Sequence, residues 1–311
     1  MAFDIFLGLL VLGLAVWIVS TRDTLAAAVE FVAFGLVVTL VWVRLAAPDV
    51  ALTEAALGSG LTGGLLLGAS TRLARAETAT SGERHGAVLR LSAAGVCALI
   101  SAAIAALVIL LPEPAPTLAP EVAANIAATG LENPLPAVLM AYRAIDTLLE
   151  VVVLLLALLA MWSLAPDHLW SGLPWRPDAV GRDGVLTFVA QLLAPVGILV
   201  GIHIFWIGSV VPGGEFQGAT ILAAMWILVT MAGLRDMPPM SRRWLRVVLV
   251  IGPAVFFAIG LAGFAIAGSF LGYPPSYAKQ LILTIEIPLT LSIAAALALL
   301  IAGPPERAAP Q

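Results

Sequence analysis

Charged residues are scarce in this sequence. Asp, Glu, Lys and Arg make up only 11% of the 311 residues, whereas 61% of the residues are hydrophobic. A soluble domain carries far more charge on its surface, so this composition excludes an ordinary water-soluble fold. The apolar residues come in runs of about 20, which is the length that crosses a bilayer as a helix. The sequence therefore predicts an all-α, polytopic helical membrane protein.

Cysteine and catalytic motifs are almost absent as well. Cys97 is the only cysteine, which excludes an intramolecular disulfide and a cysteine cluster for zinc or iron–sulfur. Its place inside an apolar run predicts a buried side chain. The sequence also lacks a phosphate-binding loop, a basic face for nucleic acid and a soluble catalytic domain. We therefore expect no enzyme activity, no cofactor and no metal in this chain, so any redox chemistry would lie in partner subunits.

Apolar runs define nine expected spanning segments. The first begins at the N-terminus, which lacks the positive flank and the cleavage site of a signal peptide, so we expect it to be retained. The segments lie at about 3–20, 24–46, 49–70, 87–111, 137–164, 184–211, 215–234, 244–268 and 279–303.

The basic residues sort cleanly between the two sides of this nine-helix arrangement. Of the 15 Lys and Arg residues, only three fall on one side, namely Arg44, Arg143 and Lys279, and the rest fall on or near the other side. Cytoplasmic connections carry the excess of Lys and Arg in membrane proteins. The distribution therefore predicts that the N-terminus lies outside and the C-terminus in the cytoplasm, in a multi-pass protein of the cell membrane.

Three charged residues interrupt the apolar stretch from Pro134 to Leu164. Arg143, Asp146 and Glu150 are spaced so that they would share one face of a continuous helix. Acids at membrane depth are costly and persist where they pair or where they line an ion path. Asp146 and Glu150 are therefore candidates for a proton or cation relay, while a structural pair between Arg143 and Asp146 is the alternative.

Other acids lie inside the predicted spanning segments. Glu30 and Glu54 each follow the start of their segment by several residues, and both are candidates for the same path. Beyond Glu54, the sequence Gly58-Ser59-Gly60 weakens the helical hydrogen bonds and predicts a bulge or rotation.

The second half of the chain adds two candidates. Glu286 lies in the middle of the last segment, where the nearby Pro288 removes an amide donor. His203 lies within the sixth segment and would titrate near neutral pH, although a histidine satisfied by a neighbouring helix is equally consistent. Asp49, Glu215 and Lys279 fall near the outer surface, where we expect solvated side chains.

Three stretches together resemble membrane subunits of the Mrp type. APDVALTEAALGSGLTGGLLL resembles the MbhD-type domain, and ENPLPAVLMAYRAIDTLLEVVVLLLALL resembles the MbhE-type domain that follows it. VVPGGEFQGATILAAMWIL resembles the MnhB domain of Mrp antiporters, with its Pro-Gly-Gly-Gly turn. The resemblance implies an MbhD-like domain over 1–80 with three helices, an MbhE-like domain over 81–170 with two, and an MnhB-like domain over 171–311 with four.

This resemblance implies a place in a multisubunit cation/proton antiporter, alongside large antiporter-like subunits and small membrane subunits. Glu54, Asp146 and Glu150 fall on acidic positions of the family and are implied to lie along the ion path. The MnhB-like part departs from the family: Ile207, Gly208 and Ser209 replace a His-Gly-His motif, and Glu215 replaces the third glycine of the turn. His203, one turn earlier, is the candidate to take over the histidine role, and the departure leaves open whether sodium ions or protons move here.

Three functions remain open at this point. The chain would be an ion-path subunit of a sodium/proton antiporter, a membrane-arm subunit of a redox-driven complex such as a hydrogenase or complex I, or a scaffold that only holds the large antiporter subunits. The sequence shows no inverted repeat with paired broken helices, so a self-sufficient carrier is disfavoured.

Overall fold

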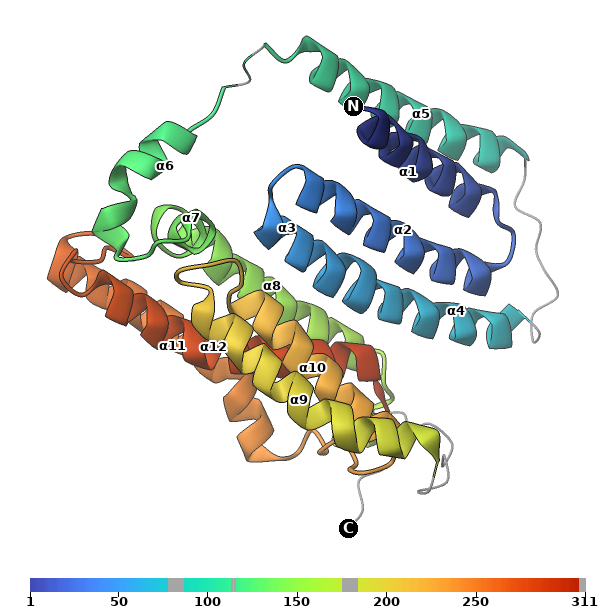
Figure 1. Ribbon diagram of the computed structural model, residues 1–311. Coiled ribbons are helices and arrows are strands. Elements are labelled where there is room, and N and C mark those ends of the chain that lie inside the picture. Colours follow the sequence, from blue (N-terminus) through green and yellow to red (C-terminus); the bar gives the residue numbers. More distant parts are fainter. Residues whose placement is uncertain (78–86, 113, 115, 175–183, 308–311) are drawn as a thin grey trace.

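The computed structural model describes residues 1–77, 87–112, 114, 116–174 and 184–307, and its helices form two groups that lie side by side (Figure 1). Within these residues, eight helices are long and apolar enough to span a membrane, and one shorter apolar helix, Glu215–Met231, accompanies them. This confirms the all-α membrane fold. The side on which each terminus lies stays a prediction, and the connections at 78–86 and 175–183 and the expected boundary at 80/81 lie outside the described residues.

The first group consists of α1 (Ala2–Ser20), α2 (Thr24–Arg44) and a long bent helix that follows a short turn. α2 contacts both α1 and the bent helix. Arg44 Nε donates to Asp4 Oδ1 at 2.7 Å, which joins the end of α2 to the start of α1. Most of α1 is exposed within this chain, so α1 is a peripheral helix held mainly by α2.

The bent helix contains the predicted irregularity. It begins as α3 (Pro48–Thr53), widens into the π-helical segment η1 (Glu54–Thr62), and continues as α4 (Gly63–Glu77). Gly58, Ser59 and Gly60 all lie within η1. Glycines weaken the regular backbone hydrogen-bond pattern of an α-helix, and π-helical turns inside helices recur at functional sites. The bulge predicted from these residues is therefore present, and it begins at Glu54.

Helix α5 (Ala87–Leu110) lies outside the second group (Figure 1). Its side chains from Leu91 to Leu110 are all exposed within this chain. Cys97 is exposed as well, so the expectation that this cysteine is buried was wrong. An apolar run predicts burial in lipid or protein, but it does not say which of the two surrounds the side chain.

The helix expected over 137–164 is not continuous. After α6 (Ala119–Asn125) and η2 (Ile126–Thr129) come α7 (Pro134–Ala137) and the π-helical η3 (Val138–Tyr142), and the chain then leaves helical geometry at Arg143. α8 (Ala144–Trp162) begins just after it. Arg143 therefore lies at the N-cap position of α8 instead of sharing a helix face with Asp146 and Glu150, which corrects the predicted three-residue stripe.

The second group is formed by α8, α9 (Val185–Ile207), α10 (Glu215–Met231), α11 (Arg243–Ala267) and α12 (Ala278–Ala302). α12 is the most buried of these helices and packs against α10, α11 and α8. Ser292 joins α12 to α11, because its hydroxyl donates to Val248 O at 2.6 Å and accepts from the Gly252 amide at 2.9 Å. Short elements η4 (Asp167–Leu169), β1 (Leu173–Pro174) and β2 (Pro305–Arg307) complete the fold, with the two strands paired antiparallel.

Candidate functional site

Two glutamates meet in the centre of the second group. Glu215 is the first residue of α10, Glu286 lies in the middle of α12, and each is only 5% exposed. Their carboxyl groups hydrogen-bond to each other. An ionised carboxylate has no hydrogen to donate, so this bond requires that one of the two carboxyl groups carries a proton. The pair is therefore a buried position that is able to hold a proton.

The turn before α10 is what brings Glu215 inside. Gly213 and Gly214 adopt φ values of 152° and 143°, a region that favours glycine. The Gly214 amide donates to Ile204 O at 3.2 Å, and a Cβ on Gly208 would lie only 2.5 Å from the Gly214 amide nitrogen. The turn therefore folds tightly against the end of α9, and the first turn of α10 begins within the helix bundle.

Asp49 fixes this turn to the first helix group. Its Oδ1 accepts from the Gly213 amide at 2.9 Å and from the side chain of Asn133 at 3.3 Å. Asn133 is buried and also donates to Gly208 O and Val211 O, each at 3.1 Å. The expectation that Glu215 is solvated was therefore wrong, since Glu215 lies in the core, whereas Asp49 is half-buried and joins separate segments.

Glu150 lines a cavity beside this pair. The cavity has a volume of about 280 Å³ and lies between α3, η1, η3, α8 and the start of α10. Thr53, Thr147, Glu215 and Gln217 contribute polar groups to its wall. Glu150 is close enough to Glu215 to interact with it electrostatically. Glu150 and Glu215 therefore share the wall of one cavity, and Glu286 joins them through its contact with Glu215.

The same cavity reaches the first helix group. Gln217 Nε2 donates to Thr53 Oγ1 at 2.9 Å, which links α10 to the residue just before Glu54. Glu54 itself does not line the cavity, because its carboxyl group lies against Gly35 of α2 and Gly58 of its own segment. The structure thus brings Glu150 and Glu286 together through Glu215, whereas the Glu54 carboxyl group lies against α2.

Tyr273 lies near Glu286, in the loop between α11 and α12. Its hydroxyl oxygen is buried and has no hydrogen-bond partner among the residues that the structure describes. Burial and the nearby Glu286 carboxyl group raise the pKa of the Tyr273 hydroxyl, in that order of size. The hydroxyl therefore stays protonated and is available as a hydrogen donor beside the carboxyl pair.

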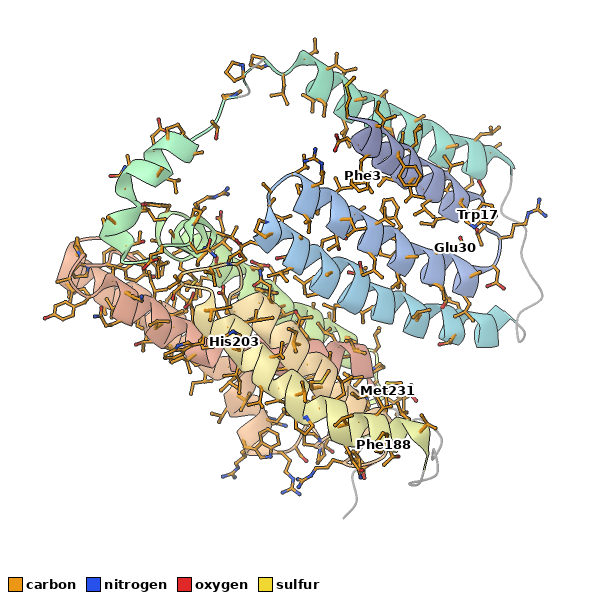
Figure 2. The ribbon with its side chains drawn as sticks, viewed as in Figure 1. Phe3, Trp17, Glu30, Phe188, His203 and Met231 are labelled. Atoms are coloured by element: carbon orange, nitrogen blue, oxygen red, sulfur yellow. The ribbon has the colours of Figure 1, made fainter. Side chains whose placement is uncertain are left out.

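The remaining predicted residues lie away from this centre. Arg143 pairs with Asp146 at 2.5 Å in an exposed position, next to a shallow cavity of about 1070 Å³ that Arg143 helps to line. Glu30 accepts from Trp17 Nε1 at 2.8 Å and from Thr21 Oγ1 at 2.7 Å, so it ties α2 to α1. His203 is exposed on α9 (Figure 2). Their roles in an ion path stay predictions.

Glu215 was not among the residues predicted from the sequence. The available signal was an acid directly after Pro-Gly-Gly, at a place where a turn enters the bundle. Within the described ranges, no three His, Cys, Asp or Glu residues gather as metal ligands. Carboxyl, hydroxyl and amide groups around a small cavity are able to hold and pass protons, or to solvate a cation in transit.

Comparisons with known proteins find family matches for two parts of the chain, one near its N-terminus and one in its second half. The MbhD family model, which describes a subunit of MBH, matches residues 9–75, and the model for a domain related to the MnhB subunit of Na+/H+ antiporter matches residues 185–303. An uncharacterized protein of Methanocaldococcus jannaschii is 27% identical over 156 residues, which is 45% of this chain and 60% of that protein.

Two solved structures share the fold. A chain of the Mrp complex from Dietzia sp. aligns over 100% of this chain with a TM-score of 0.75 and 25% identity, and this chain spans 36% of its length. A chain of the membrane-bound sulfane sulfur reductase, an archaeal respiratory membrane complex, aligns over 69% of this chain and 97% of its own length, with a TM-score of 0.53 and 23% identity.

The fold and the site define a polytopic helical membrane subunit with a buried carboxyl pair between its helices. The two family models together match more than half of the sequence. The chain therefore joins an MbhD domain to an MnhB-related domain, and its fold is that of a chain of the Mrp complex.

Proposed function

We propose that this chain is an ion-path subunit of a multisubunit cation/proton antiporter in the cell membrane, with Na+ and H+ as the ions exchanged. Glu150, Glu215 and Glu286 would carry protons or solvate cations between the cavity and the loop at Tyr273. The observation that carries the proposal is the buried hydrogen bond between Glu215 and Glu286, because a shared proton at membrane depth is what a relay requires.

The likeness to the Dietzia Mrp chain supports partners of the same kind. This chain spans 36% of the length of that chain. The large antiporter-like subunits and small membrane subunits are the expected partners. The exposed apolar helices α1 and α5 would meet either those subunits or lipid.

A redox-driven complex is the second candidate. The fold shared with the sulfane sulfur reductase chain favours it, since the same helical arrangement occurs in a respiratory complex. Genes for a hydrogenase-type arm next to the gene for this chain would support the redox candidate, whereas genes for antiporter subunits would support the first.

Transport by the assembled complex tests the proposal. Inverted membrane vesicles are energised, and proton movement is followed on addition of Na+. We expect Glu150→Gln and Glu286→Gln to abolish this movement while the complex still assembles, because an amide cannot release a proton. Glu121→Gln is the matched control, since Glu121 is exposed on α6. Normal transport in both site variants would instead establish the scaffold alternative.

A further inference from the structure

Two cavities adjoin where the first helix group meets the second. The smaller one, of about 280 Å³, is bordered by Glu150 and Glu215, and we call it the site cavity. The larger one, of about 1070 Å³, is bordered by Asp49 among others, and we call it the surface cavity. Val50 and Leu135 border both cavities, and each of the two is partly buried. Two apolar residues therefore lie at the place where the cavities adjoin.

The surface cavity lies at the ends of membrane-length helices. It is bordered by the connection between α2 and α3 and by residues 210–212, which follow α9. α2 ends at Arg44, the next span begins at Pro48, and α9 ends at Ile207. Spanning helices end near the surface of the bilayer, because their length matches its thickness. The cavity therefore lies at a membrane surface, on the side that the distribution of Lys and Arg predicts to be outside.

Charged residues of the surface cavity favour cations. Asp49, Glu132 and Arg143 border it, whereas most of the other bordering residues are apolar. The charge of Arg143 is offset by its ion pair with Asp146. A cleft with an excess of one sign of charge raises the local concentration of the opposite ion. The two carboxyl groups would therefore gather cations near the membrane surface.

Hydrogen bonds hold Val50 and Leu135 in place. Val50 follows Asp49, whose Oδ1 accepts from the Gly213 amide at 2.9 Å. The Leu135 amide donates to Asn133 Oδ1 at 3.0 Å, and Asn133 Nδ2 donates to Asp49 Oδ1 at 3.3 Å. Gly213 itself borders the site cavity. Three segments that are distant in the sequence are thus joined beside the two apolar residues, which fixes the backbone on both sides of the boundary.

We propose that the surface cavity is the entrance through which Na+ and water reach Glu150 and Glu215, and that Val50 and Leu135 form an apolar gate between entrance and site. This inference rests on the proposed function and names the route to the same site. Apolar constrictions stop ions because they exclude water. An ion would pass only when one of the two side chains moves aside, so the gate would limit exchange between the site and the surface.

Thiol labelling in the assembled complex tests the gate. Cys97 is the only cysteine of the chain, so Cys97→Ser gives a background in which Thr53→Cys is its single thiol. Thr53 borders the site cavity and is not among the residues of the surface cavity. A positively charged, membrane-impermeant thiol reagent is added on the side at which α3 begins, and labelling of this chain is followed by mass spectrometry. Labelling of Ala46→Cys identifies that side, because Ala46 is exposed between α2 and α3.

A smaller residue in the gate is expected to speed this labelling. We expect Leu135→Ala to raise the labelling rate of Thr53→Cys by about tenfold or more, because it lowers the barrier to the reagent. Val138→Ala is the matched control, since Val138 borders the surface cavity without bordering the site cavity. Should Leu135→Ala fail to assemble, Val50→Ala shortens the other gate residue.

Two results would overturn the gate. Equal labelling rates in Leu135→Ala and Val138→Ala would show that Leu135 does not separate the cavities. Labelling by a neutral, lipid-soluble reagent but not by the charged one would show that the surface cavity holds lipid instead of water and ions.

Transport after labelling tests whether ions use this route. In the same background, Leu135→Cys is labelled with the charged reagent, and proton movement on addition of Na+ is measured before and after. We expect labelling to abolish this movement, because the attached group fills the gate. The Cys97→Ser complex treated in the same way is the control. Unchanged movement after complete labelling would contradict the proposal.

These outcomes separate the gate from the proposed function. If Glu150→Gln and Glu286→Gln abolish transport while Leu135→Ala leaves labelling unchanged, the gate fails and the proposed function stands. If those two glutamine variants transport normally while Leu135→Ala speeds labelling, the proposed function fails, and Leu135 still separates the two cavities.

Discussion

The carboxyl groups of Glu215 and Glu286 hydrogen-bond to each other although they come from different helices, and both are 5% exposed. Two ionised carboxylates in such a place would repel each other strongly, since the interior screens charge far less than water does. Sharing a proton removes the repulsion and supplies the hydrogen bond. The pair therefore combines a structural link between α10 and α12 with the ability to take up and release a proton.

Replacing Glu286 separates these two properties. Glu286→Gln keeps a donor for Glu215, so we expect near wild-type thermal stability of the purified complex together with loss of transport. Glu286→Leu leaves Glu215 buried without its partner and is expected to lower the free energy of unfolding by about 1–3 kcal/mol. Equal melting temperatures for the two variants would argue against the hydrogen bond.

Asp146 and Glu150 differ in surroundings although they lie one turn apart on α8. Asp146 forms an exposed pair with Arg143, whereas Glu150 lines the cavity beside Glu215. Exposed ion pairs contribute about 0–1 kcal/mol. We expect Asp146→Asn to retain most of the transport rate and Glu150→Gln to lose it. If Asp146→Asn lost transport in the same vesicles and Glu150→Gln retained it, the ion path would run along the exposed face of α8 instead.

Asn133 is expected to be a stability determinant. It is 3% exposed, and its side chain contacts Asp49, Gly208 and Val211. Asn133→Ala would leave buried acceptors without donors, at a cost of about 2 kcal/mol or more in unfolding free energy. Thermal unfolding in detergent measures the effect. Asn125→Ala serves as its control, because Asn125 is exposed and bonds only within its own helix; a similar loss there would refute the interpretation.

Ser292 links α12 to α11 through one accepted and one donated hydrogen bond. Because Ser292 is 1% exposed, we expect Ser292→Ala to destabilise the protein by about 1–2 kcal/mol. Ser163→Ala is the comparison, since Ser163 is exposed and donates only to Ala160 O. Unchanged melting of Ser292→Ala would mean that water replaces the lost bonds.

Much of the fold was predictable because its signals are local. Helix positions follow from apolar runs, and the bulge in η1 follows from Gly58 and Gly60, since both depend on residues close in the sequence. The break at Arg143 was missed. The sequence around it is as apolar as a continuous helix requires, and the residues before the break pack against segments that are distant in the chain.

The candidate site was predictable only in part. Glu286 was predicted because it lies in the middle of an apolar run, and its depth in the membrane follows from the residues next to it in the sequence. Glu215 lies at the edge of such a run, and a hydropathy pattern places it at the surface. Its burial depends on the Gly213–Gly214 turn folding against α9 and on Asp49 holding that turn from the other helix group.

The sequence by itself determined that the chain crosses a membrane many times and carries acids at depth, because hydropathy and helical length are properties of each segment alone. Only the tertiary structure decided which acids meet. A hydrogen bond between α10 and α12 and a cavity shared by α3, α8 and α10 depend on how whole helices pack, and residues that lie far apart in the sequence supply the partners.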